Sequence, residues 1–261
     1  MISYTTIAEK IKARKFLLEE LVKRDFKKKY KRSILGIFWS VLSPVLMMLV
    51  MRLMFTQFFG RDIPYYTTYI LAGNIVFSYF RDATSEGMSA VVGNSRILTK
   101  IDLPQMLFVF SKSISFALNF GISIVVFFVF CAFDGIPFGW HFITLIIPTI
   151  LLFVFNLGIT LILSTLYVFM KDIRYLWSVC LRLLMYMSAV FYRIDGYPEA
   201  MKRLFWLNPV YVYITYFREV AMEGRVPSGF VHALAIGYAV AAFVVGRYIF
   251  RKYEDTFVFY F

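Results

Sequence analysis

Six long apolar segments alternate with polar stretches along the chain. A helix needs about 20 apolar residues to cross the hydrocarbon core of a bilayer, and lipid offers backbone groups no hydrogen-bond partner. Each segment is therefore expected to be a helix, which predicts an all-α integral membrane protein with six transmembrane helices. The segments cover residues 33–59, 65–80 with a polar continuation to about 92, 105–133, 140–170, 175–192 and 230–250.

The residues before the first apolar segment follow an amphipathic pattern. Thr6 and Glu9 fit a capping box, which predicts a helix start. Apolar side chains from Ile7 and Ile11 onward then share one helical face, while most cations fall elsewhere. We predict a cationic amphipathic helix that lies in the membrane interface, within a cytoplasmic segment of residues 1–32. A helix packed on protein is the alternative.

The stretch 193–229 is the longest polar connector, yet part of it is too apolar for an ordinary loop. Residues 201–207 suggest a short amphipathic helix, and Asn208-Pro209 marks a turn. Residues 210–222 are then apolar and aromatic, too short to span a bilayer and too apolar to sit in water. We predict an external re-entrant pair of short helices in the outer leaflet.

The distribution of cations orients the predicted spans. The connectors on the side of both termini contain 17 Lys and Arg, and those on the opposite side contain 6. Because cytoplasmic loops are enriched in cations, both termini are predicted to face the cytoplasm, with 251–261 as a tail. The chain is then one transmembrane domain, in which residues 33–192 form the first five spans and 230–250 the sixth.

Composition supports a membrane protein and disfavours several function classes. The chain of 261 residues is 60% hydrophobic and 17% charged, with 30 Phe and 18 Tyr. Its net charge of +12 lies beside apolar runs rather than on a soluble face, so no nucleic-acid partner is expected. We recognise no P-loop, metal-ligand spacing or catalytic triad in the sequence, so we expect neither enzyme activity nor a cofactor.

Charged residues inside the predicted spans need a polar surrounding. Arg81, Asp82 and Glu86 follow the apolar part of the second span. Arg81 and Asp82 are candidates for lining an aqueous path. Glu86 is expected on a helical extension into the cytoplasm.

The order of these features resembles the membrane subunit of bacterial ABC-2-type polysaccharide exporters, the O-antigen, capsule and teichoic-acid permeases. KKKYKRSILGIFWSVLSPVLMMLV is similar to that family's entry into its first span. NSRILTKIDLP and KDIRYL are similar to its two cytoplasmic connectors, although the family more often has Arg-Asp where this chain has Lys171-Asp172. FYRIDGYPEAMKRLFWLNPVYVYITYFREVAMEGRVP is similar to its external segment.

The resemblance implies a homodimeric channel driven by a separate ABC ATPase, two copies of each. This assembly would move a lipid-linked polysaccharide across the bacterial cytoplasmic membrane. The implied external gate lies at Asn208, Pro209 and Arg218. The implied ATPase-coupling residues lie on the N-terminal helix and both connectors: Ile7, Ile11, Asn94, Leu98, Lys100, Pro104, Lys171 and Asp172.

Aromatic side chains are the candidates for the channel wall, because sugar rings stack on aromatic faces. Lipid-facing bulk and interfacial belts are the alternative. Arg218 is expected to bind a lipid phosphate, a glycan or a neighbouring acid, with snorkelling as its alternative. The channel candidates are Phe38, Trp39, Tyr66, Tyr69, Phe77, Tyr79, Phe80, Arg81, Tyr186 and Tyr192.

Two other functions are open at this point. One is an ABC-2 permease for drugs or small lipids, which often carries a large external domain that this chain lacks. The other is a channel or secondary carrier that works without ATP. A neighbouring gene for a P-loop ATPase would exclude the second of these.

Overall fold

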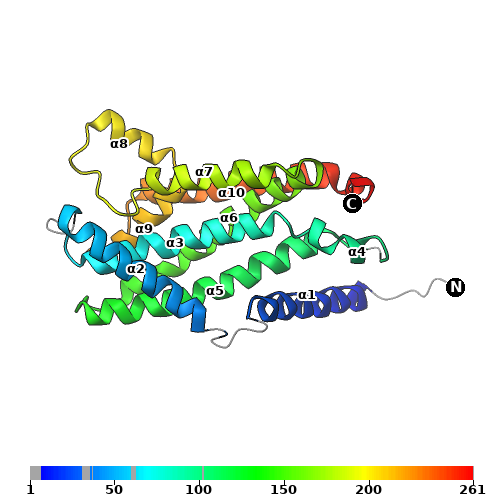
Figure 1. The fold of residues 1–261 in the computed structure, drawn as a ribbon, viewed down its shortest axis with the longest axis horizontal. Coiled ribbons are helices and arrows are strands. Elements are labelled where there is room, and N and C mark those ends of the chain that lie inside the picture. The colour runs from blue at the N-terminus through cyan, green and yellow to red at the C-terminus, as the bar shows by residue number, and fades with distance from the viewer. Residues whose placement is uncertain (1–6, 31–35, 37, 60–62, 102, 261) are drawn as a thin grey trace.

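All regular structure in the described part of the chain is helical (Figure 1). The computed structural model describes residues 7–30, 36, 38–59, 63–101 and 103–260, except the side chains of residues 7–14, 28–30, 40, 44, 51–52 and 55–59. The helices are α1 (Ile7–Tyr30), α2 (Phe38–Phe59), α3 (Tyr66–Gly87), η1 (Val92–Asn94), α4 (Ser95–Leu98), α5 (Met106–Phe133), η2 (Trp140–Leu145), α6 (Ile146–Phe169), α7 (Ile173–Met187), α8 (Glu199–Trp206), α9 (Pro209–Glu223), α10 (Gly229–Tyr253) and η3 (Glu254–Tyr260).

The long helices run along the longest axis of the molecule (Figure 1). One end carries α4, the start of α1 and the C-terminus, and we call it the connector end. The opposite end carries α8 and α9, and we call it the outer end. This arrangement separates the two predicted cytoplasmic connectors from the predicted external segment.

Three helical segments in the described residues are long and apolar enough to cross a membrane. They are Met106–Phe133, Trp140–Phe169 and Gly229–Tyr260, which match the third, fourth and sixth predicted spans. Helices α2 and α3, with 22 residues each, and α7, with 15, occupy the positions of the other three. The helical positions are thus confirmed, and six complete crossings stay a prediction.

The predicted C-terminal boundary of the fifth span, residue 192, is wrong. The sequence predicted apolar helix to residue 192, whereas α7 ends at Met187 and Ala189 turns the backbone with a φ of 49°. A residue in this left-handed conformation stops many helices, and it is usually glycine. With alanine in that place, the sequence contains no glycine or proline that marks the stop.

The backbones of helices α6 and α10 approach each other closely at glycine residues. A Cβ atom built on Gly246 would lie 2.2 Å from the Gly158 carbonyl oxygen, and one built on Gly158 would lie 2.3 Å from the Ala242 backbone. Ala235 and Ala239 are buried further along α10. These small residues let two apolar helices pack at the distance that favours association in lipid.

The two predicted short helices of the external segment are confirmed as α8 and α9, with Asn208 capping α9. Most of α9 is buried against α3, η2, α6 and α10 of the same chain. Its apolar sequence is therefore explained by contact with protein. Its insertion into the outer leaflet stays a prediction.

Helix α1 packs along α5. This contact agrees with the alternative prediction, in which the N-terminal helix packs on protein. Leu21 and Asp25 are buried there, while Phe16 is exposed. The side chains of Ile7 and Ile11, predicted to couple to an ATPase, lie outside the described residues. Contact of α1 with a membrane surface stays a prediction.

Candidate functional site

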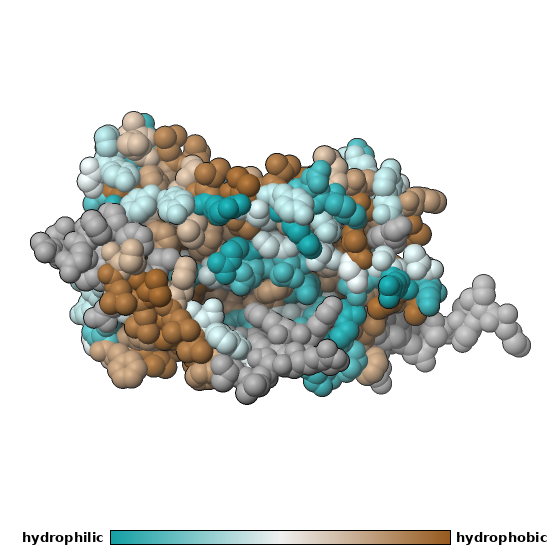
Figure 2. All heavy atoms as spheres, viewed as in Figure 1, coloured by the Kyte–Doolittle hydropathy of each residue, from teal (hydrophilic) through white to brown (hydrophobic). Residues whose placement is uncertain are grey.

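Two adjoining cavities form a polar groove along α3 and α5. The first, of 450 Å³, lies between α2, α3 and α5, and the second, of 780 Å³, continues to α1 and the connector after α3. Asp82, Phe116 and Asn119 line both cavities. Hydrophilic side chains gather over the middle of this face, beside the hydrophobic surface of α2 (Figure 2).

The walls of the polar groove combine charges, amides, hydroxyls and aromatic faces. Arg81 Nε lies 2.8 Å from Asp82 Oδ1, and both side chains are partly exposed. Tyr79 stacks on Phe120 with ring centroids 4.4 Å apart. The other polar wall residues are Arg24, Asp25, Ser43, Asn74, Ser78, Glu86, Ser89, Asn94, Arg96, Lys112, Ser115, Asn119 and Ser123.

Such a surface is unfavourable against lipid tails. An uncompensated polar group in hydrocarbon costs several kcal/mol, so polar residues at membrane depth face water, protein or a transported molecule. The groove lies between helices that flank it with exposed apolar side chains, such as Leu46 on α2 and Val125 on α5. Its position predicts an aqueous path rather than a lipid-facing surface.

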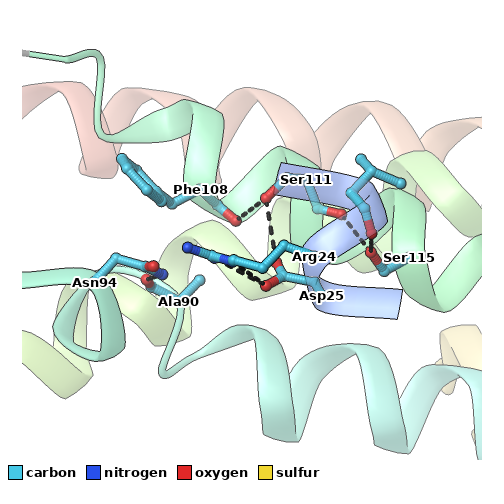
Figure 3. A network of polar contacts seen from close by, with 8 residues as sticks. Arg24, Asp25, Ala90, Asn94, Phe108, Ser111 and Ser115 are labelled. Atoms are coloured by element: carbon cyan, nitrogen blue, oxygen red, sulfur yellow. Dashed lines mark hydrogen bonds and ion pairs between the residues drawn. The ribbon is translucent and has the colours of Figure 1, made fainter. Parts of the chain in front are cut away.

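Helix α1 lines the second cavity of the groove, and Figure 3 shows its polar contacts with α5. Its Arg24 Nη2 lies 2.8 Å from Asp25 Oδ1, and the Ser111 hydroxyl donates to Asp25 Oδ2 at 3.5 Å. The Ser115 hydroxyl donates to the Val22 carbonyl at 3.3 Å. The two serines come from α5, so polar contacts as well as apolar packing join α1 to the groove wall. A movement of α1 would therefore change the shape of the groove.

The connectors and the tail pack together at the connector end. Leu98, Phe108, Leu161 and Phe257 share one apolar cluster, which also includes Leu21 of α1. Gln105 Nε2 donates to the Glu254 carbonyl at 3.0 Å, which joins the first connector to η3. These contacts make one layer from segments far apart in the sequence.

The predicted coupling residues differ in their exposure. Lys100, Pro104, Lys171 and Asp172 are exposed at the connector end, and Asn94 is partly exposed. Lys171 Nζ lies 5.0 Å from the centre of the Tyr167 ring, and partial desolvation lowers the pKa of its ammonium group. Leu98 is only 8% exposed and packs in the apolar cluster. Leu98 thus supports the surface that its neighbours present.

At the outer end, side chains bind the backbone carbonyls that follow α7. The last carbonyls of a helix have no partner within it. Asn208 Nδ2 donates to the Met187 carbonyl at 3.1 Å and to the Ser188 hydroxyl at 2.9 Å. The Tyr66 hydroxyl donates to the Phe191 carbonyl at 3.0 Å, and the Tyr69 hydroxyl to the Tyr192 carbonyl at 2.8 Å. We call Tyr66, Tyr69, Asn208 and Arg218 the carbonyl clamp.

Arg218 is the central member of the carbonyl clamp. Its Nη1 donates to the Ala189 carbonyl at 2.9 Å and to the Tyr69 hydroxyl at 2.8 Å. Its Nη2 donates to the Val190 carbonyl at 2.7 Å and to the Tyr69 carbonyl at 3.2 Å. The guanidinium carbon lies 3.4 Å from the centre of the Tyr69 ring. Arg218 is buried, so snorkelling does not describe it, and in this structure its contacts are to the protein itself.

The structure divides the channel candidates into four groups. Trp39, Tyr79 and Arg81 line the polar groove, whereas Tyr69 and Tyr192 line a cavity at the outer end. Phe77 and Phe80 are buried in the main apolar core, and Tyr66 is buried at the carbonyl clamp. Phe38 and Tyr186 are exposed away from these cavities.

Two features of the site were missed from the sequence. The first is the row of α3 and α5 amides and hydroxyls, from Asn74 and Ser78 to Ser115 and Ser123, whose shared face only a helical wheel of both helices would have shown. The second is the burial of Asp25, the single acid within a dense basic run. No residue near Asp25 in the sequence indicates its contact with Ser111.

Comparison with known proteins adds a family assignment to this geometry. The family model described as ABC-2 type transporter matches residues 17–222. That range includes α2, α3, α5 and the carbonyl clamp.

Individual relatives match over most of their length. An O-antigen export system permease protein RfbA from Klebsiella pneumoniae is 27% identical over 246 residues, 92% of this chain and 93% of that protein. A protein of the same name from Myxococcus xanthus is 28% identical over 217 residues, 81% of this chain and 82% of that protein. The polysialic acid transport protein KpsM of Escherichia coli is 18% identical over 245 residues, 93% and 95% of the two chains.

Proposed function

Because the chain belongs to the ABC-2 type transporter family, we propose that it is the channel-forming permease of an ATP-driven polysaccharide exporter. Its substrate is a lipid-linked glycan that crosses the bacterial cytoplasmic membrane. The names of the RfbA and KpsM relatives support polysaccharide as the cargo. ATP hydrolysis takes place on a separate ATPase subunit.

The observation that carries this proposal is the polar groove. A glycan needs hydrogen-bond donors, acceptors and aromatic faces along its path, and the groove offers all three. Acyl chains need none of them, so the lipid end of the substrate is expected beside the exposed apolar surface of α2. Since the groove is open on one side, a second copy of the chain is proposed to cover it and complete the channel.

Transport begins at the connector end in this proposal. The ATPase contacts the exposed connector residues Lys100 and Asp172, and closure of the ATPase pair moves the connector layer. Because α1 and the first connector share the apolar cluster of Leu21 and Leu98, they move together. The Asp25 contacts transmit this movement to α5 and so to the groove wall.

Narrowing the groove tests its role. We expect Ser78→Leu to lower surface polysaccharide roughly tenfold, because it replaces a groove hydroxyl with an apolar side chain. A tenfold decrease corresponds to an added transport barrier of about 1.4 kcal/mol. Val125→Leu on α5 is the control, since Val125 is 61% exposed outside the groove. Polysaccharide is quantified on intact cells and divided by the permease level in membranes. Equal export by the two variants would contradict the proposed path.

Exposed connector residues allow a separate test of coupling. Asp172→Ala is expected to lower the ATPase activity of the purified permease–ATPase complex without lowering the yield of the permease. Asp255→Ala, an exposed acid of η3, is the matched control. Leu98→Asp would be uninformative, because burying a carboxylate in the apolar cluster unfolds the layer itself. Transport by the chain alone in proteoliposomes without ATP would exclude the coupled mechanism.

A further inference from the structure

A third cavity, of 430 Å³, opens at the outer end of the molecule. It is bounded by the start of α3, the segment after α7, the end of α8 and one face of α9. We call it the outer cavity. Its volume falls within the roughly 300–1,000 Å³ range of small-ligand sites, and it does not share a wall residue with the polar groove.

The outer cavity combines aromatic faces with paired charges. Tyr65, Tyr192, Trp206 and Tyr211 line it, and the Trp206 and Tyr211 rings meet edge to face at 5.3 Å. Arg193 Nε lies 2.6 Å from Asp195 Oδ2. Arg225 lies 2.7 Å from Glu223 Oε2 and 3.5 Å from Glu219 Oε2.

The backbone around the outer cavity is strained. Tyr65, with a φ of 52°, and Ala189, with a φ of 49°, are the non-glycine residues with positive φ in the described chain, and both line this cavity. Such conformations are costly for residues with a Cβ atom and concentrate at functional sites. Tyr65 nevertheless presents a ring that is 45% exposed. The strained backbone at Tyr65 therefore holds a ring at the surface of the cavity, where it does not contribute to the apolar core.

We propose that the outer cavity binds a sugar ring of the glycan as it leaves the channel. A pyranose presents C–H groups to an aromatic face and hydroxyl groups at its edge. Carboxylates accept hydrogen bonds from those hydroxyls and guanidinium groups donate to them, so the charged pairs suit a polyol. This inference rests on the proposed function, because the exported glycan supplies the ligand.

The charges of the cavity disfavour a lipid phosphate. Three carboxylates, those of Asp195, Glu219 and Glu223, line the wall, and the guanidinium groups of Arg193 and Arg225 are already paired with them. The remaining guanidinium, that of Arg218, binds four groups of the carbonyl clamp. A phosphate would have to break one of these ion pairs to reach a guanidinium group and would then lie beside a carboxylate, whereas an uncharged ring with hydroxyl groups can bind the existing pairs without that repulsion.

Protection of a cysteine at the cavity wall tests the proposal. Met222→Cys is made in a Cys180→Ser background, purified with its ATPase and placed in proteoliposomes. Its labelling rate with a membrane-impermeant maleimide is measured with and without oligosaccharide released by mild acid from the cell's own surface polysaccharide. We expect the oligosaccharide to slow labelling several-fold, and Glu219→Gln to remove this slowing when each protein is compared with its own labelling rate in the absence of oligosaccharide.

The controls separate this inference from the proposed function. Glu199→Gln makes the same chemical change on α8, outside the cavity, and should leave protection intact. Protection by short-chain phosphatidylglycerol but not by oligosaccharide would overturn the proposal. So would a Met222→Cys protein that restores surface polysaccharide in cells but is never protected. If deletion of the gene leaves surface polysaccharide unchanged, the proposed function itself fails.

Discussion

Arg218 shows how this chain accommodates a buried charge without a buried acid. Its hydrogen-bond acceptors are three backbone carbonyls and a tyrosine hydroxyl, and the Tyr69 ring covers one face of the guanidinium. Removing a cation from water is costly unless several such groups replace the water. The fork shape of arginine matters here, because two adjacent carbonyls are bound by two different nitrogens.

The substitution Arg218→Lys tests whether the fork shape of the guanidinium group is required. Lysine has a single nitrogen and cannot reach all four acceptors, so we expect the loss of at least two charge-assisted hydrogen bonds of about 1.5–3 kcal/mol each. The purified permease should melt at a lower temperature, and surface polysaccharide should fall. Arg193→Lys, at a partly exposed position, is the control. An unchanged melting temperature in Arg218→Lys would show that the carbonyl clamp does not stabilise the outer end.

The sequence predicted part of the carbonyl clamp and none of its contacts. Asn208-Pro209 predicted a turn, and the structure has the cap of α9 there. Tyr66 and Tyr69 were predicted on a channel wall, whereas their hydroxyls bind carbonyls more than 120 residues away. Backbone carbonyls are the same at every position, so no residue type in the sequence could identify them as partners.

At the scale of elements, the α6–α10 pair depends on glycine. Each added Cβ atom at the contact would overlap backbone, which cannot move aside as a flexible side chain can. This contact was not predicted from the sequence, because Ala242 and Gly246 form a small-residue pair that is less conspicuous than two glycines. The length of the two apolar segments predicted both helices and left their partners open.

Gly246→Ala is expected to weaken the pair. Its methyl group would lie 2.2 Å from the Gly158 carbonyl oxygen, so the helices must separate. Gly237→Ala on the same helix meets nothing within 4 Å and should be neutral or stabilising by up to about 1 kcal/mol from helix propensity alone. Thermal unfolding of both purified variants gives the comparison. A loss of stability of equal size in both would refute the glycine contact.

The whole molecule is polarised along its length. Most exposed cations of the described residues lie with the connectors at one end, while the carbonyl clamp and the outer cavity lie at the other. Helix positions were predictable because apolar length and turn residues are local properties. Of the groove residues, only Trp39, Tyr79, Arg81 and Asp82 were predicted to line a channel, since the faces of two helices must be combined to see the rest.

Cysteine accessibility tests which end faces the cytoplasm. In a Cys180→Ser background, Pro198→Cys before α8 should react with an impermeant thiol reagent added to intact cells. Lys100→Cys in the first connector should react only after the membrane is opened, because cationic connectors stay on the inner side. Both positions are exposed, so burial cannot explain a difference. The reverse pattern would invert the proposed topology.

The carbonyl clamp also restricts how the chain can change over evolution. Between residues 187 and 192, five backbone carbonyl oxygens accept hydrogen bonds from side chains of α3, of α9 and of its cap residue Asn208. Inserting or deleting one residue in this stretch would shift every following carbonyl past its donor at once. An exposed position such as Gly196, with open space around it, faces no such requirement. Length variation among descendants of this chain should therefore be found after residue 194 and be absent between residues 187 and 192.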